Sequence, residues 1–149
     1  MVTIAGTSHD LNVLSARLRL TIARTARRLR QEAGTDLSPS LVSALATIER
    51  LGPLTPSELA HHERIQRPTA TRIVTRLEQG GLVERASDPS DGRVSLVSAS
   101  TDARRLLRKL RTRKDAYLAR RLRDLEPDEI EALERAADVL ERLLEHERA

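Results

Sequence analysis

The sequence predicts a mainly α-helical protein with one small β-hairpin, and three observations lead to this fold class. Apolar residues recur at spacings of three and four along most of the 149 residues, the period of a helix buried on one side. Leu, Ala, Arg and Glu are abundant, whereas Gly and Pro are sparse, with six each. Two short runs, 82–87 and 93–99, have β-branched or aliphatic content instead, and a loop rich in Asp, Pro and Gly separates them.

The composition restricts the core and excludes several classes of chemistry. A chain of this length forms one or at most two domains. Tyr117 is the one aromatic residue besides histidine, so Leu, Ile, Val and Ala must fill the core. The absence of cysteine excludes disulfides, cysteine-bound zinc and thiol redox sensing. No apolar run approaches the ~18 residues of a membrane span, and no signal-peptide core is seen. We expect a soluble, cytoplasmic protein that does not associate with a membrane.

The charge is compatible with a polyanionic partner. The formal net charge is +4, and all but two of the 26 basic residues are arginines. Arginine-rich, lysine-poor composition can reflect selection for phosphate binding or equally a GC-rich genome. Charge therefore permits a nucleic-acid partner without establishing it.

The first predicted element is a long amphipathic helix from about residue 8 to residue 33. Ser8 is its expected N-cap, and Gly34 follows as a residue favoured where helices end. Its other faces carry six arginines, which form either a solvated surface or a border to DNA or to a second subunit.

Two shorter helices are expected next. Ser38-Pro39, an N-cap followed by proline at the first helical position, opens a helix over 39–51. Thr55 and Glu58 have the spacing of a capping box and predict a helix over 56–62.

The next helix, 66–79, carries the functional argument. Ala70, Ile73, Val74 and Leu77 lie at i, i+3, i+4 and i+7 and form one apolar stripe. The outward face is cationic and hydroxylated, and it comprises Pro68, Arg72, Thr75 and Gln79, flanked by Thr69, Thr71 and Arg76. Such a face suits the DNA major groove, because guanidinium groups contact guanine edges and phosphates and hydroxyls contact phosphate oxygens.

The two short runs after this helix predict a β-hairpin with a charged tip at 88–92. One hairpin alone is marginally stable, so it must pack on the preceding helices. A helix, a turn, a second helix and a hairpin in this order form a winged helix-turn-helix, which we expect over residues 36–100.

Two further helices follow, over about 102–125 and from 127 onward. Residues 104–123 hold ten Arg or Lys and one Asp, whereas residues 124–147 hold ten Asp or Glu and two Arg. Long terminal helices with narrow apolar seams have little of their own chain to bury against. We therefore expect residues 1–35 and 101–149 to form the dimerisation region of a homodimer.

The run RPTATRIVTRLEQGGLVER followed by DPSDGR resembles the core signature of the multiple antibiotic resistance regulator (MarR) family of winged-helix transcription factors. The helix order matches along almost the whole chain. The resemblance implies a homodimeric regulator, usually a repressor, that binds pseudo-palindromic double-stranded DNA. It also implies that a small-molecule effector can release the DNA, although nothing in the sequence marks an effector pocket.

The resemblance also assigns roles to individual residues. In the family, the recognition helix enters the major groove and the wing reaches the minor groove. Arg93 becomes the wing arginine and Asp91 its support. The matching positions that become groove or phosphate contacts are Gln66, Arg67, Thr69, Thr71, Arg72 and Arg76, and Thr75 joins them from the outward face of the helix.

Three features depart from the family pattern. Glu63 stands where an aliphatic residue is common, and Arg64 occupies a turn position that often holds Gly. The segment 98–103 lacks the usual Leu-Thr and following Gly.

Metal binding, catalysis and DNA compaction are the alternatives to DNA-dependent regulation. Adjacent helix residues point about 100° apart, so His61 and His62 make a poor chelate, and no metal or other cofactor is expected. No Gly-rich phosphate loop or recognisable catalytic arrangement predicts an enzyme. The remaining alternative is a nonspecific, nucleoid-associated architectural DNA-binding protein, because basic helices also serve compaction.

Overall fold

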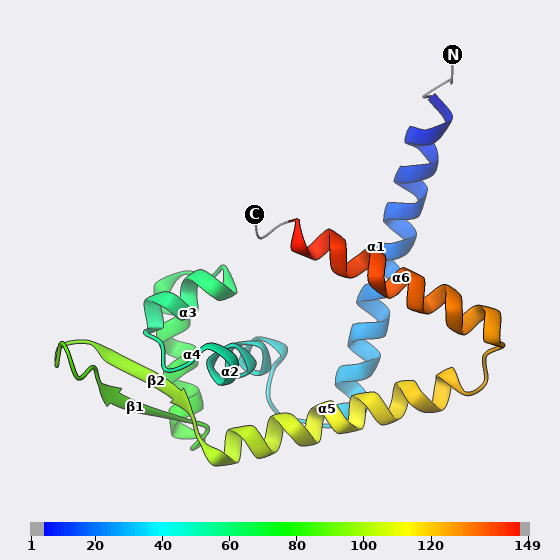
Figure 1. The fold of residues 1–149 in the computed structure, drawn as a ribbon. Helices are drawn as coiled ribbons and strands as arrows, with labels where there is room; N and C mark the ends of the chain where they lie inside the picture. Colours follow the sequence, from blue (N-terminus) through cyan, green and yellow to red (C-terminus); the bar gives the residue numbers. More distant parts are fainter. Residues whose placement is uncertain (1–4, 147–149) are drawn as a thin grey trace. The chain divides into compact units, whose positions relative to one another are not determined.

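The computed structural model describes residues 5–146, and their elements are shown in Figure 1. The predicted fold class, mainly helical with a hairpin in a winged helix-turn-helix, is confirmed. The chain divides into two compact units between Lys114 and Asp115. The elements in chain order are α1 (Ala5–Ala33), α2 (Pro39–Leu51), α3 (Pro56–Glu63), α4 (Arg67–Gln79), β1 (Val83–Ser87), β2 (Ser95–Ala99), α5 (Thr101–Leu122) and α6 (Pro127–Glu145).

Local capping signals account for the starts of α2 and α3. The Ser38 Oγ accepts the backbone N–H of Leu41 at 3.3 Å. In α3, the Thr55 hydroxyl accepts the Glu58 N–H at 3.1 Å, and the Glu58 carboxylate accepts the Thr55 N–H at 2.8 Å. These bonds satisfy backbone donors that a helix start leaves unpaired.

Two predicted helix boundaries were wrong. The first helix begins at Ala5, so Ser8 lies inside it, where serine costs only a fraction of a kcal/mol relative to alanine, about 0.5. The fifth helix ends at Leu122 rather than near residue 125. Its last backbone bonds, such as Leu125 N–H to the Leu122 oxygen at 3.2 Å, are of the shorter turn type that separates it from α6.

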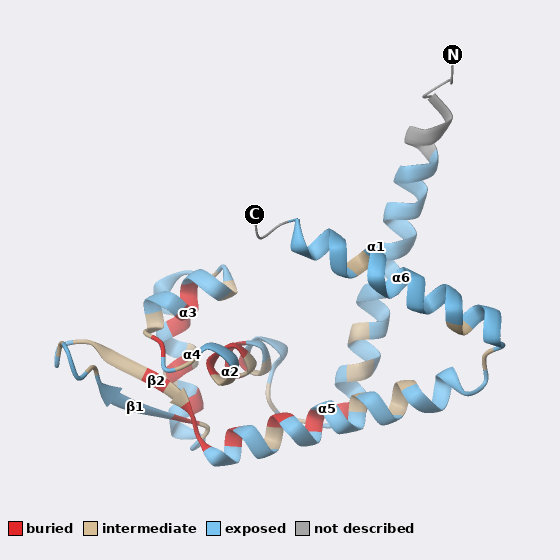
Figure 2. Ribbon diagram, viewed as in Figure 1, coloured by how far each residue is buried: buried red, intermediate tan, exposed pale blue. Residues whose placement is uncertain are grey.

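An aliphatic core fills the winged region, as the composition predicted. Figure 2 shows the buried positions concentrated in α2, α3, α4, β2 and the first turns of α5. The largest fully buried side chains are those of Leu45, Ile48, Leu59, Leu77, Val74 and Val97. This core fixes the angle between α3 and α4 and holds the hairpin against them.

The hairpin is antiparallel, with a register from Val83 opposite Ala99 to Ser87 opposite Ser95. A third piece of chain, which the sequence did not predict, pairs with it. Leu54 and Val97 exchange two backbone hydrogen bonds, of 3.0 and 2.8 Å. This pairing anchors the hairpin to the segment between α2 and α3.

The departure from the family pattern at 98–103 has a local explanation. The Ser100 hydroxyl donates to the Gly81 carbonyl at 2.8 Å and accepts the Ala103 N–H at 3.1 Å. Ser100 thereby caps the start of α5 and ties it to the turn that follows α4.

The terminal helices differ from the winged region, because their apolar residues are mostly exposed. On α1, Leu11 is 56% exposed and Ile22 is 49% exposed. On α6, as far as the chain is described, no residue is buried, and Leu144 is 64% exposed. Within residues 5–146, no helix has both the length and the apolarity that crossing a membrane requires.

Candidate nucleic-acid interface

Helix α4 has two opposed faces, as the sequence predicted. Ala70, Val74 and Leu77 are at most 1% exposed and face the core. Ile73 is partly buried and packs against the same cluster. The other side of the helix lies open to solvent, so its side chains are available to a partner without any rearrangement of the core.

The outward face of α4 is hollowed into a shallow groove of about 490 Å³. It is lined by Thr71, Arg72, Thr75, Arg76 and Gln79. Within residues 5–146, neither arginine of this groove forms an ion pair. Unpaired guanidinium groups are strong donors to phosphate oxygens and to guanine edges.

The threonine hydroxyls of this face are engaged within the helix. The Thr71 hydroxyl donates to the Arg67 carbonyl at 3.1 Å, and the Thr75 hydroxyl donates to the Thr71 carbonyl at 2.9 Å. The Thr69 hydroxyl accepts from the Arg72 guanidinium at 3.5 Å. In this conformation Thr71 and Thr75 present oxygen lone pairs outward, and donating to a phosphate requires them to rotate.

The start of α4 adds two exposed polar side chains. Gln66 occupies the N-cap position with extended backbone angles, φ −71° and ψ 146°, and its side chain makes no capping bond. Arg67 follows it and is exposed. The open amides of a helix N-terminus attract anions, and Arg67 adds a positive charge at the same end.

The tip of the hairpin is a structured turn that projects Arg93. The Arg93 side chain is 93% exposed. The Asp91 Oδ1 accepts the Arg93 backbone N–H at 3.1 Å and its Nε at 3.3 Å. Asp91 therefore lies where it restrains the arginine that the sequence assigned to the wing.

Asp88 stabilises the other side of this tip. Its Oδ1 accepts the Ser90 hydroxyl at 2.7 Å and the Ser90 N–H at 2.9 Å. These hydrogen bonds hold the pKa of the Asp88 carboxyl below its usual range, and the bond from the Ser90 hydroxyl contributes most. The turn is thus favoured with Asp88 ionised.

Arg85, which sequence reasoning did not single out, joins the wing to α4. Its Nε donates to the Glu78 Oε2 at 3.0 Å, and its Nη2 contacts the Thr75 hydroxyl at 3.4 Å. Glu78 and Arg85 lie on different elements separated by Gly80-Gly81, so no helical spacing relates them. The contact neutralises the carboxylate beside the cationic face.

The two histidines of α3 lie against each other. The His61 and His62 rings meet edge to face with centroids 5.8 Å apart. Within the described residues, no three metal-binding side chains converge.

Comparison with known proteins identifies the family. The MarR family model matches residues 37–95. An uncharacterised helix-turn-helix transcriptional regulator of Mycobacterium bovis is 38% identical over 128 residues, which cover 85% of this chain and 90% of that protein. The crystal structure of a proposed transcriptional regulator of Pseudomonas aeruginosa superposes with a TM-score of 0.81 at 36% identity, covering 91% of this chain and 96% of that one. The chain belongs to the MarR family. It is a DNA-binding transcriptional regulator.

A more distant structure shares the fold. FabT of Streptococcus pneumoniae, solved in complex with DNA, superposes with a TM-score of 0.69 at 18% identity. It covers 91% of this chain and 97% of that one. The likeness shows that the two chains share one fold.

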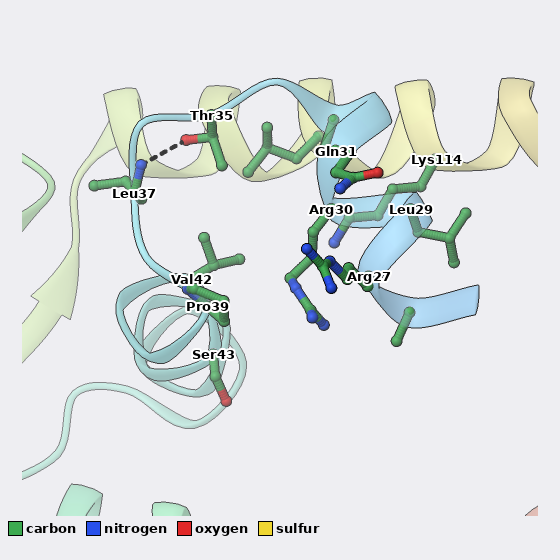
Figure 3. Close-up of a pocket in the computed structure, with 13 residues that line it drawn as sticks. Arg27, Leu29, Arg30, Gln31, Thr35, Leu37, Pro39, Val42, Ser43 and Lys114 are labelled. Carbon is green, nitrogen blue, oxygen red and sulfur yellow. Dashed lines mark hydrogen bonds between the residues drawn. The ribbon is translucent and has the colours of Figure 1, made fainter. Parts of the chain in front are cut away.

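This MarR-family protein also has a pocket of about 790 Å³ bounded by α1, α2 and α5. Figure 3 shows Arg27 and Arg30 of α1 on one side and Val42 and Ser43 of α2 on the other. Lys114 of α5 adds a third positive charge, and none of the described residues that line the cavity is acidic or aromatic. Cationic and aliphatic walls suit a small anion with an apolar body.

Proposed function

We propose that the protein is a homodimeric repressor that binds pseudo-palindromic operators, with α4 in the major groove and the wing in the minor groove. The single observation that carries this proposal is the outward face of α4, where the exposed Arg72 and Arg76, neither in an ion pair within residues 5–146, border a groove. Arg93 is displayed at the tip of the hairpin and restrained by Asp91, which suits it to a narrow, electronegative minor groove.

The proposed DNA contacts fall into two classes. Arg72 and Arg76 are assigned to base edges or phosphates, because both are exposed on the outward face, Arg72 at mid-helix and Arg76 in the last turn. Contacts that fix the position of the helix on the backbone are assigned to Gln66, Arg67, Thr69, Thr71 and Thr75.

The dimer is proposed from the exposed apolar seams of the terminal helices. Leucines on α1 and α6 are roughly half exposed in the single chain, which is unfavourable for long amphipathic helices in water. We assign dimerisation to residues 1–35 and 101–149 and DNA binding to residues 36–100. Two copies would place two α4 helices on the two half-sites of a palindrome.

We assign the cationic pocket between α1, α2 and α5 to a small-molecule effector. Its three positive charges and aliphatic walls favour an apolar carboxylate or a phenolate over a cation or a neutral sugar. A calorimetric titration with benzoate tests this class of anionic ligand, because the chain has no tryptophan whose fluorescence could report binding. Equal binding of benzylamine would contradict the assignment.

The central experiment is a fluorescence-anisotropy titration against DNA from the gene's own upstream region, with a shuffled duplex as competitor, at two salt concentrations. A regulator should prefer its operator by about 10³-fold or more, with two chains per site. Equal, steeply salt-dependent binding to operator candidates and shuffled DNA would favour the architectural alternative. Run-off transcription from the same promoter then separates repression from activation.

A further inference from the structure

The last residue of α3 makes a pair of hydrogen bonds that neither the family nor the proposed DNA contacts explain. The Glu63 Oε2 accepts the Ser43 hydroxyl at 2.7 Å, and its Oε1 accepts the Thr47 hydroxyl at 2.5 Å. Both donors lie on α2, one helical turn apart. One carboxylate therefore bridges two successive turns of α2 and fixes the C-terminal end of α3 to that helix.

The position of this contact in the chain gives it a consequence. Arg64 follows immediately and adopts left-handed backbone angles, φ 54° and ψ 44°. A residue with a Cβ is disfavoured there, and glycine is the usual solution. Two residues later the chain enters α4 at Gln66. The strained turn is thus the hinge between the fixed end of α3 and the helix that faces DNA.

The turn at Arg64 has few other contacts. Arg64 N–H reaches the His61 oxygen at 3.3 Å and Ile65 N–H reaches the Ala60 oxygen at 3.0 Å, both within the same helix end. The Arg64 side chain is exposed, and Ile65 is only partly buried. Among residues 5–146, the polar contacts that tie the end of α3 to another element are those of Glu63.

Thr47 makes the carboxylate hard to replace. Its side chain is 7% exposed, and among the described residues every buried side-chain polar atom has a partner. The partner of the Thr47 hydroxyl is Glu63. An aliphatic residue at position 63 would remove this acceptor, and the buried hydroxyl would have to turn to a backbone carbonyl of its own helix, as those of Thr71 and Thr75 do.

We propose that Glu63 is a positioning residue for DNA binding: held by Ser43 and Thr47, it maintains the left-handed turn at Arg64 and so sets the orientation of α4. This inference rests on the proposed operator binding. It explains both departures from the family pattern together, because the carboxylate at 63 supports the non-glycine residue at 64.

The test is a double-mutant cycle on operator affinity. Glu63→Ala should weaken operator binding by about tenfold, the equivalent of about one hydrogen bond to a charged acceptor, with little change on shuffled DNA. Arg64→Gly alone should leave the affinity near that of the parent protein. Combined with Glu63→Ala, it should recover most of the loss, because glycine adopts the turn without support.

Two further variants separate positioning from simple loss of stability. Glu63→Gln keeps an acceptor and should bind operator within about threefold of the parent. Glu49→Gln is the matched control: it removes the 2.9 Å ion pair from α2 to Arg111 of α5 and should not change the ratio of operator to shuffled affinity. Ser43→Ala, which removes one of the two donors, serves if Glu63→Ala does not fold by circular dichroism.

The outcomes distinguish this inference from the proposed function. If the parent protein prefers its operator and Glu63→Ala binds that operator with the same affinity, the positioning role is wrong but the proposed regulatory function stands. An equal loss in the presence and absence of Arg64→Gly would also overturn it. If the parent binds no duplex selectively, the proposed function fails first.

Discussion

The winged region and the terminal helices differ in how far they bury their apolar side chains. In the winged region, leucines such as Leu45 and Leu59 are almost completely buried by their own chain. On α1 and α6, Leu14 and Leu133 are each nearly half exposed. The first region has the core of an independent domain, whereas the second has the surface of an incomplete one. Stability that depends on a second copy should therefore reside in the terminal helices alone.

The largest expected effect tests the self-contained core. Leu45→Ala removes a fully buried side chain and should lower the free energy of unfolding by about 2–5 kcal/mol. The loss should be the same at every protein concentration in urea unfolding of the winged region. A concentration-dependent loss would mean that this core is completed by the second subunit.

The proposed dimer seam on α6 gives the next effect. Leu133→Glu places a charge on the apolar stripe of α6 and should raise the dimer dissociation constant by about 100-fold or more, measured by sedimentation equilibrium. Glu134→Ala, on the neighbouring exposed position, is the control. An unchanged dissociation constant would exclude this seam from the interface.

The outward face of α4 should contribute to binding without contributing to stability. Arg72→Ala should cost about 1–3 kcal/mol on operator DNA if this arginine reads a base, while the unfolding midpoint stays constant. Near-unchanged affinity would remove Arg72 from the recognition face.

The wing should have a smaller effect, visible mainly in its dependence on salt. Arg93→Ala should weaken operator binding and reduce the slope of log affinity against log salt by about 1, provided the arginine neutralises one phosphate. Anisotropy titrations at four salt concentrations give this slope. A parallel line would show that the wing does not touch the backbone.

The smallest effect concerns the order of the wing tip. The pKa of Asp88 is lowered in the folded state, so its stabilisation is present above the unfolded pKa, about 3.9, and is lost as the pH falls through the folded value. Amide exchange or chemical shifts of Ser90 and Val94 should report loosening below that pH, and Asp88→Asn should abolish the dependence. Loosening that persists in Asp88→Asn would assign it to another group.

Local signals made much of the fold predictable. The Ser38-Pro39 start, the capping box at Thr55 and the stripe of α4 each act within one or two helical turns, and all three appear as expected. The same reasoning placed Arg72 and Arg76 on an exposed face. Family resemblance, rather than spacing, drew attention to Arg93 and Asp91.

What escaped prediction depends on contacts between elements far apart in the sequence. Glu63 meets Ser43 across 20 residues, and Leu54 pairs with Val97 across more than 40. Arg85 reaches Glu78 only because the hairpin folds back on α4. The period of apolar residues along the chain does not predict such contacts, because they depend on how whole elements pack together. The departures at Glu63 and Arg64 were visible in the sequence, but the proposed link between them depends on the contacts of Glu63 with α2.

Ser43 belongs to two neighbourhoods, because it lines the cationic pocket and also donates its proton to Glu63. A hydroxyl has one proton to give. A ligand that accepts a hydrogen bond from Ser43 thus competes with Glu63 for it, and by thermodynamic reciprocity the state in which Glu63 holds that proton binds the ligand more weakly. Ligand occupancy of the pocket and the orientation of α4 would then be coupled through the hydroxyl of Ser43.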